Sequence, residues 1–258
     1  MNIFILHVLA DVAAGMHCDT HANKMLLEAT QILYTVMYMM NIDTSVLGTK
    51  PYRKTHEFHP CTLWALACKA HAYWILDFAI ALGVVRQNVY KTGHKSTEHL
   101  DAMKRTMCFD SLPATTTPAK WAKQLKGMGI SDDNIKSCLS KVALKNPPNG
   151  CIFGVACVDV PDYLVDDIFV YCGTQIDLVE TYRRFMVFKA KRKMSFEWDD
   201  KKVPPDEYGS LFDDIMPDED MLTNKQVLAM NKMKREVKQQ EAEAKKLKRE
   251  LKKRKRAA

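Results

Sequence analysis

Hydrophobic and polar positions alternate with a helical period along residues 17–40. The apolar residues recur at intervals of three and four, which is the spacing of one buried helix face. This apolar set comprises Ala22, Leu26, Ala29, Leu33, Val36 and Met40. A polar stripe with the same spacing adjoins it and comprises His21, Lys24, Glu28, Gln31 and Thr35. The segment is therefore predicted to be a half-buried helix with an imidazole, an ammonium and a carboxylate within mutual reach.

The polar stripe has two interpretations. A helix is a rigid element on which a functional site can be built, and such a site needs polar groups beside a buried face. A solvated helix face with an ordinary ion pair between Lys24 and Glu28 would show the same pattern.

The remaining periodicity predicts a mainly α-helical, compact bundle. Pro60 suits the first turn of a second helix over residues 60–90, and a third helix is expected over residues 97–107. Another amphipathic helix is predicted over residues 177–193. Residues 2–9 are apolar and are expected to form a buried strand or extended segment.

Composition divides the chain into a helical domain with appendages. The domain is expected in residues 1–111 and 146–200, with a helical-hairpin insertion in residues 112–145. An acidic linker is predicted for residues 201–222 and a basic helical tail for residues 223–258.

Charge is concentrated at the C-terminal end. Residues 221–258 hold 14 basic and 4 acidic residues, which leaves 24 basic and 27 acidic residues in residues 1–220. The net charge of +7 is thus a property of the tail. We expect the tail to bind DNA or another polyanion without sequence specificity.

The insertion contains two glycines, Gly127 and Gly129, between its two short predicted helices. This turn resembles the hairpin of helix-hairpin-helix DNA-binding elements, in which glycine lets the backbone approach a phosphate. Any helical hairpin can turn on glycine, so DNA contact through Gly127 and Gly129 is one of two open interpretations.

Basic and aromatic residues mark further candidate DNA contacts. His56 and His59 lie at the predicted start of the second helix, where free backbone amides and the helix dipole favour anions. The other candidates are Arg53, Lys54, His94, Lys95, Tyr182, Arg183, Arg184 and Lys189. Tyr182 stands where aromatic and basic residues interleave, a pattern that suits stacking on bases and pairing with phosphates. Packing histidines and a buried aromatic helix face are the structural alternatives.

The cysteines and the hydropathy of the chain indicate which cellular compartment and which partners to expect. The eight cysteines show no CxxC pair or regular spacing, which favours reduced thiols in an intracellular protein. No apolar run reaches the roughly 18 residues that span a bilayer, so no membrane partner is expected. His17, Cys18 and His21 could begin a metal site, but no second cluster answers them, and no metal is expected.

Five motifs together resemble a known family. They are MNIFILH, HCDTHANKMLLEATQIL, YRKTHEFHPCTLW, GHKS and YRRFMVFKAK. This set is similar to phage-borne proteins described as pyrimidine-dimer DNA glycosylase-like and, more distantly, to the phage endonuclease V glycosylase. The distant likeness rests on Asp19-Thr20-His21 followed by Glu28, on the helix that begins at His59-Pro60, and on the segment near Tyr182. The resemblance covers about residues 1–107 and 146–200.

The resemblance implies a bundle of three main helices and catalysis without metal or cofactor on damaged or modified duplex DNA. In that family the terminal amine attacks C1′ of the nucleotide, forms an imine and cleaves the strand by β-elimination. Carried over, Glu28 is the catalytic carboxylate, His21 a substrate-side or proton-handling residue, and Met1 bears the amine. Because Met1 precedes the bulky Asn2, we expect Met1 to be retained, and Lys24 is then the fallback amine.

The predicted function is that of a DNA-binding N-glycosylase, with an accompanying AP lyase activity left open. Arginines that the family carries on its catalytic helix are replaced here by Leu27 and Gln31, so other basic residues would contact phosphates. One rival is another enzyme on the same scaffold that acts on nucleotides or RNA. A second is a non-catalytic viral nucleic-acid-binding protein. For a viral protein the expected compartment is the host cytoplasm or nucleus during infection.

Overall fold

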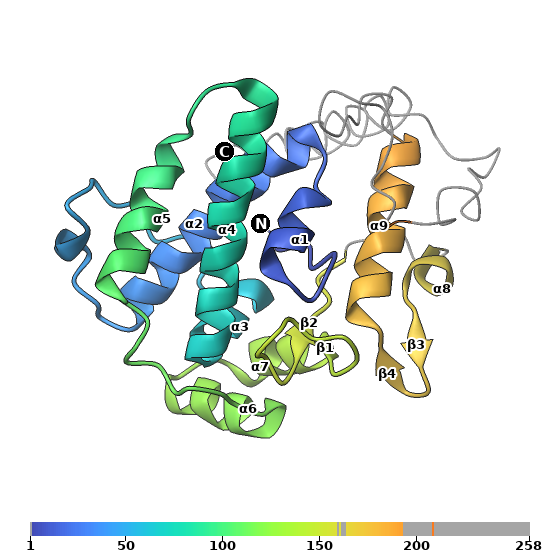
Figure 1. Ribbon diagram of the computed structural model, residues 1–258. Helices are drawn as coiled ribbons and strands as arrows, with labels where there is room; N and C mark the ends of the chain where they lie inside the picture. Colours follow the sequence, from blue (N-terminus) through green and yellow to red (C-terminus); the bar gives the residue numbers. More distant parts are fainter. Residues whose placement is uncertain (1, 159, 161–163, 193–207, 209–258) are drawn as a thin grey trace, which may run out of the picture.

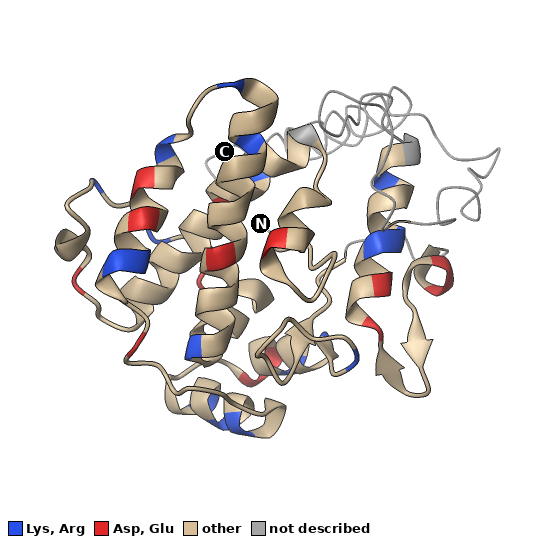
Figure 2. Ribbon diagram, in the orientation of Figure 1, with Lys and Arg blue, Asp and Glu red and all other residues tan. Residues whose placement is uncertain are grey.

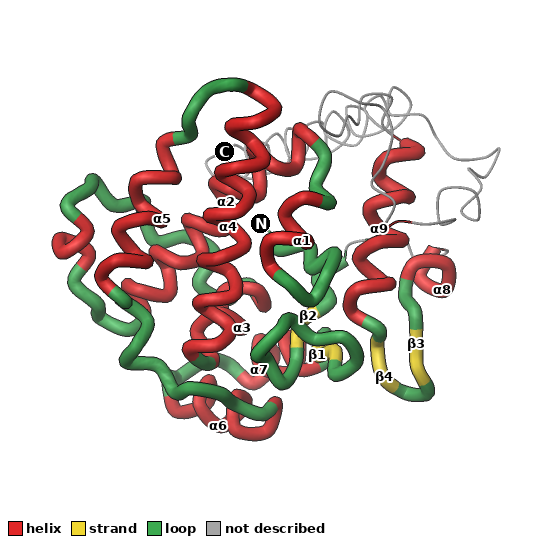
Figure 3. The backbone as a smooth tube through the Cα atoms, viewed as in Figure 1, coloured by secondary structure: helices red, strands yellow, loops and turns green. Residues whose placement is uncertain are grey.

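The computed structural model describes residues 2–158, 160, 164–192 and 208, which form a mainly helical fold (Figure 1). The helices are α1 (Ala10–Gly15), α2 (Asp19–Met39), the 3₁₀ helix η1 (Thr44–Leu47), α3 (Pro60–Ala67), α4 (Lys69–Tyr90), α5 (Lys95–Thr106), α6 (Pro118–Gly127), α7 (Asp132–Leu139), α8 (Val165–Ile168) and α9 (Leu178–Arg192). Short antiparallel ribbons pair β1 (Val142–Ala143) with β2 (Gly154–Val155) and β3 (Tyr171–Cys172) with β4 (Gln175–Ile176). The mainly α-helical prediction is confirmed, and Figure 3 shows how little strand the described chain contains.

The helix α2 lies at the centre of the fold and packs against α4, α3 and α5. Members of the predicted apolar set from Ala22 to Val36 are fully shielded from solvent, and Met40 is half-buried beyond the helix end. Ile32 and Met37 are also buried, so α2 hides more than one face. The helix predicted for residues 17–40 is therefore confirmed, with slightly shorter bounds.

The prediction of one helix over residues 60–90 is wrong, because the chain breaks at Cys68 into α3 and α4, which are bent by 118°. Cys68 is fully extended, with φ −164° and ψ 166°. The N–H of Lys69 donates to the carbonyl of Pro113 over 2.7 Å instead of continuing the helix. At the end of α3, His71 Nδ1 lies 2.8 Å from the carbonyl oxygen of Trp64. Partners distant in sequence thus satisfy the backbone groups that the break exposes.

The segment predicted to be buried over residues 2–9 is buried only in its middle, and Leu9 is 41% exposed. Residues 3–6 are buried and belong to no strand of the described chain. The carbonyl of Val8 accepts hydrogen bonds from Trp74 Nε1 and from the N–H of Asn149, both over 2.8 Å. The start of the chain is therefore enclosed between α4 and the loop before β2.

The two helices predicted within residues 112–145 are present as α6 and α7, and they pack on α3. Each has a side-chain cap at its N-terminus, Thr117 for α6 and Ser131 for α7. Trp121 is fully buried, and its Nε1 donates to the carbonyl of Leu63 over 2.9 Å. The hairpin therefore shares the core of the main domain.

Other predicted segments are described only in part. The third helix, α5, begins and ends earlier than predicted, at Lys95 and Thr106. The acidic linker and the basic tail lie outside the described residues, except for Tyr208, whose hydroxyl donates to the carbonyl of Met16 over 3.0 Å. Among the described residues no single helix has the length and hydropathy of a membrane span, and only the bent pair of α3 and α4 meets those criteria jointly.

Candidate active site at the start of the chain

Glu28 projects from α2 toward the start of the chain, and each of its carboxylate oxygens faces a nitrogen atom. The backbone N–H of Asn2 donates to Glu28 Oε2 over 2.9 Å, and Lys24 Nζ lies 3.6 Å from Glu28 Oε1. The side chain of Glu28 is 12% exposed and that of Lys24 is 66% exposed. The carboxylate is therefore shielded, while the amine one helical turn away reaches solvent.

The side chain of Asn2 is held by Cys61, Cys157 and Tyr182, which we call the amide socket. Asn2 Nδ2 donates to the carbonyl of Cys157. Asn2 Oδ1 accepts from the Tyr182 hydroxyl and from Cys61 Sγ, each over 3.4 Å. Tyr182 lies on α9, Cys61 in the first turn of α3 and Cys157 just after β2. Hydrogen bonds from three separate segments therefore hold Asn2 with its backbone nitrogen against Glu28.

Cys61 and Cys157 form a thiol pair within the amide socket. Contact with Cys157 holds the pKa of Cys61 below its usual range, although burial opposes this, and His59 also lowers it. The pKa of Cys157 is raised, because its thiol donates to Cys61 and because it is buried. Burial likewise raises the pKa of Tyr182. The two pKa values thus move in opposite directions because one thiol donates to the other.

The loop before α3 lies along the polar stripe of α2. The Thr35 hydroxyl donates to the carbonyl of Thr55 over 2.9 Å and accepts from the N–H of Thr55 over 3.2 Å. His59 caps α3, with its Nδ1 accepting from the N–H of Cys61 over 3.2 Å. This loop thus runs from the Thr35 end of the stripe to the amide socket.

His21 lies at the other end of the stripe and contacts α9. Its Nε2 is 3.0 Å from Lys189 Nζ, and the same ammonium lies over the rings of Phe4, at 5.0 Å, and Phe185, at 5.4 Å. A charged lysine can only donate, so His21 Nε2 is the acceptor in this contact. The structure therefore brings a second amine to the predicted proton-handling histidine.

The basic residues predicted to contact DNA differ in their exposure and in their internal hydrogen bonds and ion pairs. Arg53, Lys54, His56 and Lys95 are exposed, and Lys54 forms an ion pair with Glu57. His94 instead caps α5, with its Nδ1 accepting from the N–H of Ser96 over 3.1 Å, and burial lowers its pKa. Figure 2 shows basic and acidic residues mixed along α4 and α5, whereas α9 begins with acidic residues and continues with basic ones. His59 and His94 thus have the structural role of helix caps.

The prediction that Tyr182 stacks on DNA bases is wrong, because its ring is fully buried in the amide socket. Its neighbours on α9 also make internal contacts. Arg183 Nε donates to the carbonyl of Leu6 over 3.0 Å, and Arg184 Nε lies 3.3 Å from the carboxylate of Glu180. The interleaved aromatic and basic residues therefore form a buried helix face with a partly exposed basic side, which was the structural alternative.

Gly127 and Gly129 are both exposed, but they differ in backbone conformation. Gly127 is the last residue of α6, and Gly129 follows it in the left-handed region, with φ 76°. The N–H of Ile130 donates back to the carbonyl of Leu125 over 3.1 Å, which is a Schellman closure of the helix. Gly129 is thus explained by the turn itself, whereas the turn does not require glycine at position 127.

Alanine at these two positions should therefore have opposite effects on stability. Gly127→Ala is expected to stabilise the fold by about 0.5–1 kcal/mol, because a Cβ there meets open space within a helix. Gly129→Ala is expected to destabilise it by about 1–2 kcal/mol, because alanine is strained at positive φ. Urea unfolding measures both. If Gly127 also lets the backbone approach DNA, Gly127→Ala weakens DNA binding despite its higher stability, and unchanged affinity would contradict that role.

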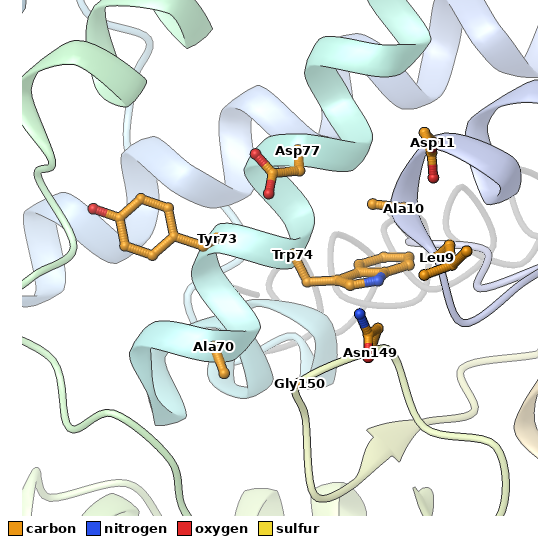
Figure 4. Close-up of a pocket in the computed structure, with 9 residues that line it drawn as sticks. All are labelled: Leu9, Ala10, Asp11, Ala70, Tyr73, Trp74, Asp77, Asn149 and Gly150. Atoms are coloured by element: carbon orange, nitrogen blue, oxygen red, sulfur yellow. The ribbon is translucent and has the colours of Figure 1, made fainter.

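A separate cavity of about 390 Å³ opens between α1 and α4 (Figure 4). Its lining residues are Leu9, Ala10, Asp11, Ala70, Tyr73, Trp74, Asp77, Asn149 and Gly150. Asp11 and Asp77 give it two carboxylates, which disfavour a phosphate ligand. None of the predicted site residues lines it, so we assign the candidate site to Glu28 and Asn2.

The described residues contain no cluster of three or more His, Cys, Asp or Glu side chains suited to a metal ion. All eight cysteines are free thiols. No protein-family model, curated protein or solved structure matches the chain.

Glu28, Lys24 and His21 were predicted from the sequence as site residues, and the amide socket was not. The structure pairs Lys24 with Glu28 and places His21 against Lys189. Met1 lies outside the described residues. Asn2, Cys61 and Cys157 belong to segments far apart in the chain, and no local pattern marks them as neighbours. The one sequence feature that pointed to any of them is the position of Cys61 directly after His59-Pro60, at a predicted helix start.

Proposed function

We propose that this protein is a DNA N-glycosylase that acts on damaged or modified duplex DNA through an amine nucleophile and the Glu28 carboxylate. The observation that carries the proposal is the pair of nitrogen atoms on the two oxygens of Glu28, at 2.9 Å and 3.6 Å. Lys24 Nζ is a primary amine and so places a nucleophile beside a proton acceptor, and the nitrogen of Asn2 does the same once Met1 is removed. The motif resemblance supports the same chemistry independently of these distances.

In this proposal the amine nitrogen attacks C1′ of the nucleotide, and the bond from C1′ to the base breaks with its electron pair leaving on the base. Glu28 accepts the proton that the attacking nitrogen loses and stabilises the positive charge that develops on the sugar. The nitrogen lone pair then forms the imine as the C1′–O4′ bond breaks with its electron pair leaving on O4′, and Glu28 returns its proton to O4′. β-Elimination of the 3′-phosphate is the optional lyase step.

Three amines are candidates for the nucleophile: the terminal amine of Met1, the nitrogen of Asn2 and Lys24 Nζ. The backbone nitrogen of Asn2 is an amide while Met1 is attached and becomes a primary amine only after Met1 is removed. Lys24 carries a primary amine in either case and is exposed to solvent. If Met1 is removed, the shielded position and the fixed side chain favour the nitrogen of Asn2. If Met1 is retained, the candidates are its terminal amine and Lys24.

Borohydride trapping with full-length protein tests the proposal. Duplexes with ultraviolet, alkylated, oxidised or enzymatically modified bases are assayed for base release, and the imine is reduced to a stable crosslink. Mass spectrometry then locates the crosslink, at the N-terminal peptide or at Lys24, and also reports whether Met1 is present. Lys123→Gln, on the exposed side of α6, is the matched control for Lys24→Gln. Absence of base release and of a specific crosslink on all these substrates would contradict the proposal.

The contacts of Glu28 also support a second candidate, a non-catalytic nucleic-acid-binding protein. A carboxylate that accepts from a backbone N–H and pairs with a lysine is fully explained by structure alone. In that case the protein binds intact and modified duplexes alike, with affinity that falls steeply with salt, and releases no base.

A further inference from the structure

Residues 56–59 form a tight turn that presents Phe58 to solvent between α2 and α3. The N–H of His59 donates to the carbonyl of His56 over 3.0 Å, and His56 has a positive φ of 51°. The side chain of Phe58, at the tip of this turn, belongs to a residue that is 49% exposed. The ring of Phe58 is therefore about half exposed to water. The turn that exposes it also places His56 at a positive φ, which costs conformational energy for any residue other than glycine.

The turn is fixed at both ends. Before it, the paired hydrogen bonds between Thr35 and Thr55 attach the chain to α2. After it, the His59 cap and Pro60 begin α3, whose Cys61 contacts the side chain of Asn2. Phe58 is therefore displayed on a rigid support that runs directly into the amide socket beside Glu28.

Charge around the turn suits a nucleic acid. Arg53 and His56 are exposed on the same loop, and the carboxylate of Glu57 is paired with Lys54. Cationic side chains flanking an exposed aromatic ring are the combination with which proteins hold phosphates and stack on bases. A ring inserted between bases can also hold a duplex open beside a nucleotide that has left the stack.

We propose that Phe58 stacks on a nucleobase next to the nucleotide that Glu28 acts on, and so holds the DNA open at the site. This inference rests on the proposed function for the place of the reacting nucleotide. Phe58 would then determine how tightly the protein binds unstacked DNA. It was not among the site residues predicted from the sequence.

The test compares Phe58→Ala, Phe58→Leu and Phe58→Trp with Tyr171→Ala in the full-length protein. Tyr171, on β3, is 54% exposed and is the matched control for removal of an exposed aromatic ring. The probe is a duplex with an abasic-site analogue next to 2-aminopurine, whose fluorescence reports loss of stacking in the DNA. Phe58→Ala and Phe58→Leu are expected to weaken binding roughly 10-fold to 100-fold and to abolish the 2-aminopurine change. Phe58→Trp should retain both, with new tryptophan fluorescence that is quenched by DNA.

The inference is overturned by parent-like affinity and 2-aminopurine signal in Phe58→Ala, or by equal losses in Phe58→Ala and Tyr171→Ala. A parent protein that binds no DNA would overturn it as well. Failure of the proposed glycosylase function gives a different result from failure of the stacking role. If the parent shows the Phe58-dependent signal but releases no base from any substrate, the stacking role stands and the glycosylase assignment falls.

Discussion

Glu28→Gln is expected to lower base release by roughly 100-fold or more while DNA binding survives. Glutamine keeps the shape of the side chain and can still accept the hydrogen bond from the N–H of Asn2. It cannot accept the proton from the attacking amine or stabilise positive charge on the sugar as a carboxylate does. Single-turnover base release and equilibrium binding, measured on the same duplex, separate the two effects.

Asp77→Asn is the matched control, because Asp77 is also paired with a lysine, Lys104 at 2.6 Å, but lies outside both the amide socket and the turn of residues 56–59. Its base release should equal that of the parent. If Glu28 is only structural, Glu28→Gln costs about 1 kcal/mol of stability at most and leaves the rate unchanged. A parent-like rate of base release in Glu28→Gln would remove the proposed catalytic role.

Acidification from pH 7 to pH 5 is expected to lower the free energy of unfolding by about 4 kcal/mol. Burial lowers the pKa of both His17 and His71 from 6.5 to about 4. In this range the unfolded chain binds protons that the folded protein excludes, so stability falls as the pH falls below 6.5. Each histidine contributes about 1.4 kcal/mol per pH unit until its folded pKa is reached.

Urea unfolding at pH 7, 6 and 5 measures this dependence. In both histidines Nδ1 lies against a backbone carbonyl, that of Ala13 for His17 and that of Trp64 for His71. Their Nε2 atoms are buried and have no hydrogen-bond partner among the described residues. His71→Phe preserves an aromatic ring beside Trp64, against which His71 stacks at 4.4 Å. That variant should lose about 2 kcal/mol less than the parent between pH 7 and 5, whatever its stability at pH 7. Constant stability of the parent across this range would contradict the assignment.

Local signals in the sequence were enough for most helices. The spacing of apolar residues predicted α2, because a helix buries every third or fourth residue whatever it packs against. Pro60 and Pro118 occupy first turns of helices, where a missing N–H costs nothing, and Gly129 closes α6 at a positive φ. The same spacing placed Lys24 and Glu28 together, since residues four apart on a helix are neighbours.

Tertiary structure alone decided the features on which the candidate site depends. The apolar pattern runs through Cys68 without interruption, yet the chain bends there because Pro113 and His71 take over backbone hydrogen bonds. Tyr182 has the sequence context of a surface aromatic, but packing of α9 buries it against Asn2. Periodicity describes which side of one element is buried, and it carries no information about which distant residue fills the space opposite. The contact between the start of the chain and Glu28, 26 residues apart, is therefore a property of the folded structure.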